Sequence, residues 1–238
     1  MVRRALAELL GTALLVMAII GSGIAATRLS PGQTGLQLLE NSLVTGAALV
    51  ALILALQPVS AAFNPIITLA ERVLGVLGTR EGLVLIAVQL VGGLLGAVLA
   101  NLMFGLPPIS VATQNRGGAG VWLAEVIATA GLVLIIFGAA RSGRTDRIAY
   151  AVGAYIAAAY WFTSSTSFAN PAVTSARMFS DSFAGIAPGS VPPFLIAQLL
   201  GGAVGYAIVR YLYPSSTSFQ NAKERHDHQP DRRAVGRR

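Results

Sequence analysis

The sequence contains no cysteine and only two histidines, His226 and His228, which both lie in a strongly charged stretch. Without cysteine, we expect no disulfide framework, thiolate metal site or cysteine nucleophile. A serine–histidine–aspartate arrangement is implausible when both histidines sit in such a stretch. The glycine-rich segment 117–120 lacks the Lys-Ser/Thr of a phosphate-binding loop. These absences argue against an enzyme, and we expect no cofactor and no bound metal.

Charge is also scarce. Of the 238 residues, 11% are Asp, Glu, Lys or Arg and 54% are hydrophobic, and the mean hydropathy is +0.67. A soluble domain carries about 25% charged residues. A helix that crosses a bilayer needs roughly 20 apolar residues, and the chain has uncharged runs of that order at 41–70, 82–102, 148–176 and 182–209. The composition therefore predicts an all-α membrane protein.

Six stretches are predicted to cross the membrane: 5–26, 40–57, 82–104, 120–140, 148–164 and 191–213. The first is longer than the roughly 7–15 apolar residues of a cleaved signal peptide, so we interpret it as a span. Six crossings place both termini on one side, where most basic residues also fall: Arg3, Arg4, Arg72, Arg80, Arg141, Arg144, Arg147 and the tail. The positive-inside rule then predicts cytoplasmic termini.

The net charge of +7 comes from short connections and from the tail, 214–238. That tail has low hydrophobicity and many charges, which predicts a disordered cytoplasmic segment. Because the basic residues follow the predicted membrane topology, we expect no nucleic-acid partner.

An internal repeat organises the rest of the chain. Three segments recur in the same order at nearly constant spacing: LAELLGTALLV (6–16) and LAEVIATAGLV (123–133), FNPIIT (63–68) and ANPAVT (169–174), and QLVGG from Gln89 and QLLGG from Gln198. The halves, about 1–110 and 118–213, each hold three spans. An odd number of spans gives the halves opposite orientations, which is an inverted repeat.

Two short apolar segments, 64–75 and 170–180, begin with Asn-Pro and are too short to cross. Asn is a preferred N-cap and Pro a preferred first helical residue, so each segment predicts a half-helix that starts near mid-membrane. Irregular backbone at that depth must be buried or line a water-filled passage. The boxes are Asn64, Pro65 and Ile66, and Asn170, Pro171 and Ala172. Free asparagine N–H groups and two positive helix ends favour neutral solutes and repel cations.

The paired Asn-Pro boxes, the Ala-Glu pairs at Glu8 and Glu125, and the two Gln-x-x-Gly-Gly segments resemble the major intrinsic protein (aquaporin and aquaglyceroporin) family. The resemblance covers residues 1–213. It implies six transmembrane helices plus two re-entrant half-helices, a passive channel for small neutral solutes, and a homotetramer in the lipid bilayer of the cell membrane.

The first box departs from the family pattern because it has Ile66 where alanine is usual, and we expect this larger side chain to narrow or reshape the midpoint. The run before it, 60–64, is one residue shorter than usual and lacks histidine. The second box has Val173 where most members have arginine. Arg177 lies one helical turn further on, and Glu71 occupies the equivalent place in the first half.

We predict that Glu71 and Arg177 face opposite mouths of the pore. One hypothesis is that Arg177 replaces the missing filter charge at a displaced site. The alternative is that it snorkels to the membrane interface or binds the C-terminal end of its own half-helix.

The selectivity constriction is predicted at Thr45, Ala158, Ser167 and Val173. Three alternatives stay open: Val44 in the second span, Tyr160 within the fifth-span stretch 157–160, and Thr166 in the loop. The favoured set is wider, less cationic and less aromatic than a water-selective filter. It therefore predicts passage of glycerol-like polyols or neutral metalloid hydroxides such as arsenite. The second box also resembles that of bacterial members associated with arsenic resistance.

Glu8 and Glu125 are carboxylates within predicted spans, which by default suggest a functional site or proton relay. Their symmetry favours a scaffold role, so we expect each to accept hydrogen bonds from the loop before a half-helix. An ion-coupled transporter also uses inverted repeats and broken helices, but 41–70 and 148–176 hold no ionisable acid or base. A passive channel is favoured, and a water-only channel stays an alternative.

Overall fold

The computed structural model describes residues 1–214, which form a bundle of helices without β-strands in that range. The helices are α1 Val2–Leu29, α2 Thr34–Leu56, α3 Pro65–Val73, α4 Thr79–Met103, α5 Ala119–Arg141, α6 Ile148–Phe162, α7 Pro171–Arg177 and α8 Val191–Leu212. One-turn 3₁₀ helices, Thr145–Arg147 and Pro188–Ser190, precede α6 and α8. The prediction of a disordered tail concerns residues that, from 215 on, lie outside the described part.

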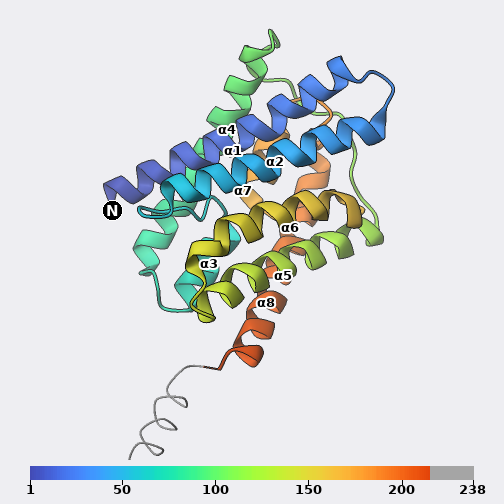
Figure 1. Ribbon diagram of the computed structural model, residues 1–238. Coiled ribbons are helices and arrows are strands. Elements are labelled where there is room, and N and C mark those ends of the chain that lie inside the picture. The colour runs from blue at the N-terminus through green and yellow to red at the C-terminus, as the bar shows by residue number, and fades with distance from the viewer. Residues whose placement is uncertain (215–238) are drawn as a thin grey trace, which may run out of the picture.

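The six predicted spans correspond to α1, α2, α4, α5, α6 and α8. All but α6 are long and apolar enough to cross a membrane. The α6 helix has 15 residues, or about 22 Å at 1.5 Å per residue, and the 3₁₀ turn Thr145–Arg147 lengthens it at its start. It runs beside α2 and α5 within the bundle (Figure 1).

The inverted repeat is visible in the packing. In the first half α1 packs chiefly against α4, and in the second half α5 packs chiefly against α8. The half-helices α3 and α7 contact each other in the interior, and each also packs between α4 and α8. The start of α1 and the end of α8 lie at the same end of the bundle (Figure 1). The predicted fold of six spans and two half-helices is therefore confirmed.

Glycines allow the main helix pairs to approach closely. A Cβ atom at any of four glycines would collide with a backbone carbonyl of the facing helix: Gly92 with Leu9, Gly96 with Ala13, Gly201 with Val126, and Gly205 with Ala130. Small residues at such spacing are the usual means of tight helix association in membranes. The α1–α4 and α5–α8 pairs thus form two matched walls that hold the half-helices between them.

The third residue of each Asn-Pro box faces a glycine of the other half. Ile66 of α3 packs toward Gly202 of α8, and Ala172 of α7 lies against Gly93 of α4. Ile66 is 3% exposed and is absent from the lining of the central cavity described below. The prediction that Ile66 narrows the midpoint is therefore wrong, because the larger side chain occupies the space that Gly202 leaves free.

Replacing Gly202 with alanine is expected to destabilise the protein, because the new Cβ would lie 2.7 Å from Cγ2 of Ile66. Overpacking of this kind costs about 1–3 kcal/mol. Ile66→Ala removes the colliding side chain but has its own cost of burial, so Gly202→Ala should cost less when it is introduced into Ile66→Ala than into the wild type, as measured by thermal unfolding in detergent. Gly189→Ala, where a Cβ meets nothing within 4 Å, is the matched control. An equal cost of Gly202→Ala in both backgrounds would contradict the contact.

Candidate functional site

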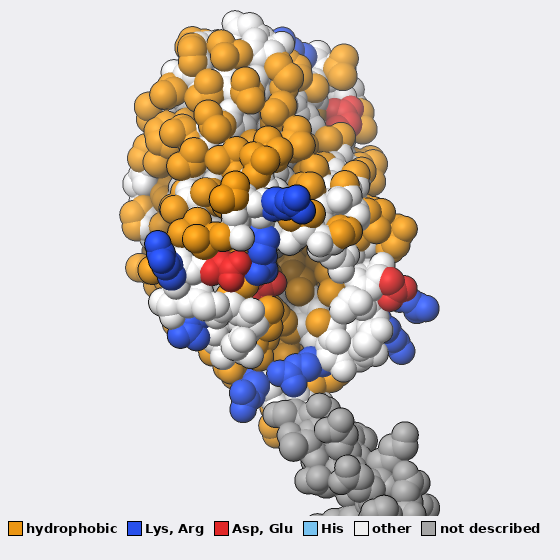
Figure 2. All heavy atoms as spheres, turned by 90° about the vertical axis from the view of Figure 1, so that its left-hand side faces the viewer, with side chains coloured by type: hydrophobic (Ala, Val, Ile, Leu, Met, Phe, Trp, Pro, Cys, Tyr) orange, Lys and Arg blue, Asp and Glu red, His pale blue; other side chains and the backbone are white. Residues whose placement is uncertain are grey.

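A cavity of about 230 Å³ runs along the centre of the bundle between the two half-helices. It extends from Arg4, at the start of α1, to Arg177, at the end of α7. We call its two ends the N-terminal mouth, where Arg4 and Glu71 line it, and the Arg177 mouth. Figure 2 shows a hollow with charged side chains around it on the face toward which the N-terminus points, and hydrophobic side chains cover most of the area above the hollow in that view. The cavity is thus a candidate passage through the apolar part of the molecule.

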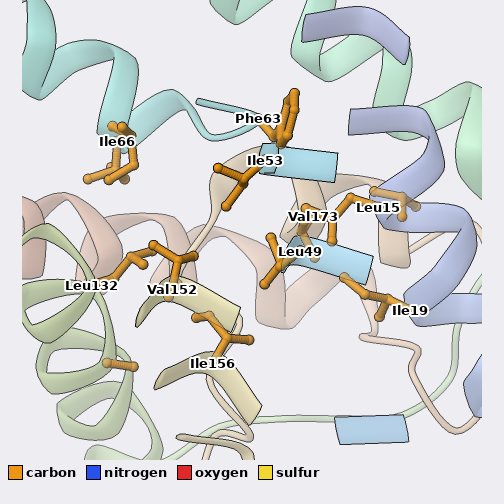
Figure 3. Close-up of a cluster of buried hydrophobic side chains, with 14 of the residues drawn as sticks. Leu15, Ile19, Leu49, Ile53, Phe63, Ile66, Leu132, Val152, Ile156 and Val173 are labelled. Atoms are coloured by element: carbon orange, nitrogen blue, oxygen red, sulfur yellow. The ribbon is translucent and has the colours of Figure 1, made fainter. Parts of the chain in front are cut away.

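The wall of the cavity is largely hydrocarbon. Side chains from α1, α2, α5 and α6 point into one shared space (Figure 3), and those that line the cavity include Leu15, Ile19, Leu49, Ile53, Leu132, Val152 and Ile156. Each of them is less than one-tenth exposed. Such a wall offers no partner to an ion, so polar contacts along the cavity must come from the half-helices and the loops before them.

The two asparagines meet where the half-helices begin, and each donates to the other half of the chain. Nδ2 of Asn64 lies 2.8 Å from the carbonyl oxygen of Ala169, and Nδ2 of Asn170 lies 2.7 Å from that of Phe63. Their side-chain oxygens accept from the first turn of their own helices, Asn64 from the amide of Ile66 and Asn170 from that of Ala172. Both asparagines line the cavity. Each Nδ2 carries a second hydrogen, for which residues 1–214 supply no acceptor.

The residues before the asparagines adopt backbone conformations that make this exchange possible. Phe63 and Ala169 both have φ of 48°, a left-handed region that ordinary residues seldom occupy. Their carbonyls accept from the opposite asparagine, and their amides donate to a carboxylate of their own half. The strain is therefore held by hydrogen bonds on both sides of the same residue.

The carboxylates that hold this backbone are Glu8 and Glu125, both 0% exposed. Glu8 accepts from Ser60 Oγ and from the amides of Ala62 and Phe63, at 2.5–2.8 Å. Its last donor is Nε2 of Gln89, at 2.8 Å. The hydrogen bonding predicted for Glu8 from the sequence is confirmed.

Glu125 repeats the arrangement in the second half. It accepts from the amides of Phe168 and Ala169, both at 2.9 Å, and from Nε2 of Gln198 at 2.8 Å. Gln198 bridges to Thr174 of α7 as Gln89 bridges to Thr68 of α3. Because every oxygen of the two carboxylates already accepts a hydrogen bond, the geometry ties them to the loops and helices rather than to a solute in the cavity.

Four side chains gather between Asn170 and the Arg177 mouth. Thr45, Tyr160, Ser167 and Val173 all line the cavity and are at most 3% exposed. The hydroxyl of Tyr160 lies 3.1 Å from Oγ1 of Thr45. Since Thr45 donates its single proton to the carbonyl of Asn41, Tyr160 is the donor of the pair. Oγ of Ser167 is buried without a partner in the described residues.

The position predicted in the fifth span needs correction. Ala158 is exposed on α6 and takes no part in the cavity, whereas Ile156 and Tyr160 line it. The reason is helical phase: Val152, Ile156 and Tyr160 follow one another at four-residue intervals along one face. Of the alternatives left open, Val44 is 43% exposed and Thr166 lines a separate cavity. Of the four cavity-lining side chains Thr45, Tyr160, Ser167 and Val173, one is aromatic and none is basic.

Arg177 occupies the end of the cavity beyond Val173 and is 2% exposed. Its Nε donates to the carbonyl of Ala184, and its Cζ lies 3.5 Å from the ring centroid of Phe168. Such burial excludes snorkelling, and the carbonyl that it binds belongs to the loop after α7 rather than to the end of α7. At the N-terminal mouth, Arg4 forms an ion pair of 2.8 Å with Glu81, while Glu71 lines the cavity.

Comparison with known proteins agrees with this geometry. The family model described as Major intrinsic protein matches residues 1–157 and 141–235. The chain belongs to this family. A curated relative, aquaglyceroporin AqpS from Rhizobium meliloti (strain 1021), is 46% identical over 211 residues, which are 88% of this chain and 90% of the relative.

The fold is also similar to a solved member. The X-ray structure of the aquaglyceroporin from Plasmodium falciparum matches with a TM-score of 0.69 and 17% identity, covering 93% of this chain and 99% of that one. As a major intrinsic protein, the chain is a membrane channel and not an enzyme.

Two features of the site in this major intrinsic protein were not singled out from the sequence. Tyr160 stood only as an alternative, although the spacing from Val152 and Ile156 would have singled it out. The contacts of Arg116 and Arg177 with Phe168 join the loop before α5 to the segment that contains α7. No local pattern in the sequence predicts them.

Proposed function

We propose that this major intrinsic protein is a passive channel for uncharged solutes larger than water, namely glycerol-like polyols and neutral metalloid hydroxides such as arsenite. The observation that carries the proposal is the presence of Val173 in the cavity lining at the place where most members have arginine. The printed name of the similar AqpS, an aquaglyceroporin, supports the same class of solute.

The mechanism rests on two unlike sides of the cavity. Asn64, Asn170, Tyr160 and Ser167 offer hydrogen-bonding groups along one path. Hydrocarbon side chains of α1, α2, α5 and α6 form the remaining wall. A polyol replaces its lost water on the polar path and slides its carbon atoms along the apolar wall, whereas an ion finds no full replacement for its hydration. The positive ends of α3 and α7 add a barrier to cations.

Arsenous acid fits the same path. It is neutral when undissociated and carries three hydroxyl groups, so it presents donors and acceptors as glycerol does. The ring at Thr45, Tyr160, Ser167 and Val173 is the proposed constriction. In this proposal Tyr160 takes the place first assigned to Ala158, and Val173 lets the wider solutes pass.

We also propose a membrane location, a topology and an oligomeric state for the channel. The chain lies in the cell membrane with both termini cytoplasmic, so the N-terminal mouth faces the cytoplasm and the Arg177 mouth faces outward. The exposed outer faces of the long helices carry many large apolar side chains, which suits contact with lipid and with other copies in a homotetramer. We propose that each subunit has its own pore.

The test is the side-by-side permeability of proteoliposomes to water, glycerol and arsenite, measured by stopped-flow light scattering and arsenic uptake. Glycerol and arsenite should both cross faster than in empty liposomes, with no dependence on a proton or sodium gradient. Water flux without glycerol or arsenite flux would contradict the proposal in favour of a water-only channel. Flux that requires an ion gradient would favour a coupled transporter.

A further inference from the structure

A second cavity of about 190 Å³ adjoins the Arg177 mouth and is not part of the path through the constriction. Its polar lining comes from Thr34, Asn41, Gln114, Arg116, Thr166 and Arg177. Arg177 lines both cavities, so this side chamber and the end of the central cavity share that side chain. Its volume is several times the roughly 30 Å³ that one water occupies in the liquid, which leaves room for a small hydrated solute.

The chamber contains one buried arginine, Arg177, and one partly buried arginine, Arg116, on a shared aromatic ring. Cζ of Arg177 lies 3.5 Å, and Cζ of Arg116 lies 5.2 Å, from the ring centroid of Phe168. The two guanidinium carbons are therefore no further apart than the sum of those distances. Like charges at such separation repel each other, and burial strengthens the repulsion because less water screens it.

Neither arginine has an acidic partner. Within residues 1–214 the ion pairs are Arg4 with Glu81 and Arg147 with Asp146. Of the acids near this end of the bundle, Asp181 accepts from Thr113 and Glu40 accepts from Ser30. Glu125 acts favourably on both arginines through its charge, but its oxygens are bound by the amides of Phe168 and Ala169 and by Gln198 rather than by either guanidinium. Burial lowers the pKa of Arg116, and the favourable charges of Tyr160 and Glu125 only partly oppose this effect.

Backbone carbonyls accept hydrogen bonds from only some of the N–H groups of the two guanidinium groups. Arg116 donates to the carbonyls of Phe183 and Gly185 and to the side chain of Gln114, and Arg177 donates through Nε to the carbonyl of Ala184. Nη1 and Nη2 of Arg177 and Nη1 of Arg116 make no hydrogen bond within the described residues. The loop 183–185 thus orients both groups and leaves donors available on the chamber side.

From these contacts we infer that the side chamber is an anion-binding site, in which a small oxyanion bridges the free N–H groups of Arg177 and Arg116. Arginine is suited to this task because its planar fork binds two oxygens of one phosphate or carboxylate group. An anion there offsets the repulsion between the two guanidinium groups. Because Arg177 also lines the end of the central cavity, the bound anion lies beside the entrance of the path proposed above, so its binding slows the flux of neutral solutes.

Two measurements on the full-length protein test the inference with inorganic phosphate as the probe. Isothermal titration in detergent, with chloride keeping the ionic strength constant, should show saturable binding. Arg177→Gln should weaken that binding by about tenfold or more, equivalent to about 1.4 kcal/mol. Phosphate should also slow glycerol flux into wild-type proteoliposomes over the same concentration range.

The matched control is Arg28→Gln. Arg28 also lies over a phenylalanine, with Cζ 5.2 Å from the ring centroid of Phe104, and donates to a backbone carbonyl, but it lines neither cavity. Its loss should leave phosphate binding unchanged. Equal binding in wild type, Arg177→Gln and Arg116→Gln, or no binding to wild type, would overturn the inference. If Arg177→Gln does not fold, Arg116→Gln carries the comparison.

The oxyanion has two possible sources, a free ion or a lipid phosphate. Glycerol flux in phosphatidylcholine vesicles, with and without phosphatidylglycerol, separates them. If phosphatidylglycerol slows glycerol flux in the wild type but not in Arg177→Gln, the site binds a lipid headgroup. If only added phosphate slows glycerol flux, the site binds a free ion. The inference partly rests on the proposed function, but absence of glycerol flux would defeat only that function, because the titration is independent of flux.

Discussion

Replacing Val173 with arginine should reduce glycerol and arsenite permeability by about tenfold or more, since an added barrier of about 1.4 kcal/mol gives that factor. Val173 lines the cavity beside Thr45, Tyr160 and Ser167, and the longer side chain would project into that ring. It would also bring a guanidinium one turn from Arg177, on the same face of α7. Water needs less room and should continue to pass. Stopped-flow permeability of the variant to all three solutes measures the change.

Two further variants separate the causes. Val173→Met adds length without charge, so its effect gives the steric share of the arginine result. Val73→Arg places an arginine on the other half-helix at a residue that is 62% exposed, and it should leave permeability unchanged. If Val173→Arg passes glycerol at the wild-type rate, the constriction does not include residue 173.

Removing the carboxylate of Glu8 should prevent the protein from folding. In Glu8→Ala, Ser60, Ala62, Phe63 and Gln89 lose a common acceptor. A buried donor left without a partner costs about 1–3 kcal/mol. Gln89 keeps its hydrogen bond to Thr68, but three such losses are comparable to the whole stability of a typical protein, about 5–15 kcal/mol. The readouts are the yield of monodisperse protein after detergent extraction and its thermal unfolding.

The control for this variant is Glu81→Ala. Glu81 pairs with Arg4 at the surface, where the two side chains are 27% and 34% exposed, and exposed ion pairs contribute about 0–1 kcal/mol. Its loss should lower the unfolding temperature little. A Glu8→Ala protein that unfolds at the temperature of the control would show that the loop before α3 is held by other contacts.

The sequence predicted the fold because the decisive signals are local. Apolar run length marks the spans, and Asn-Pro marks the start of each half-helix, as the side-chain caps of Asn64 and Asn170 show. The recurrence of both signals in the two halves gave the inverted repeat. The hydrogen bonding of Glu8 and Glu125 was predicted from the same repeat, because a buried carboxylate next to irregular backbone can accept from the free amides of that backbone.

Side-chain direction was harder to predict. Ala158 was chosen by counting along the chain, but the phase of α6 turns that position outward and Tyr160 inward. Ile66 was expected to face the cavity, yet Gly202, which lies far along the sequence, provides space for it elsewhere. The partners of Arg177 come from loops whose course depends on the assembled bundle. Such contacts produce no recurring pattern of residues in the sequence.

The exchange of hydrogen bonds between Asn64 and Ala169, and between Asn170 and Phe63, bears on how the chain is made. A ribosome delivers Asn64 more than a hundred residues before its acceptor. Until the second half of the chain has been synthesised, the N-terminal end of α3 lacks the half of its neighbours that this part of the chain supplies. The carbonyl of Phe63 also lacks its donor, Asn170. The nascent first half therefore reaches its final form only when the second has inserted, so the two duplicated halves mature together although they are synthesised one after the other.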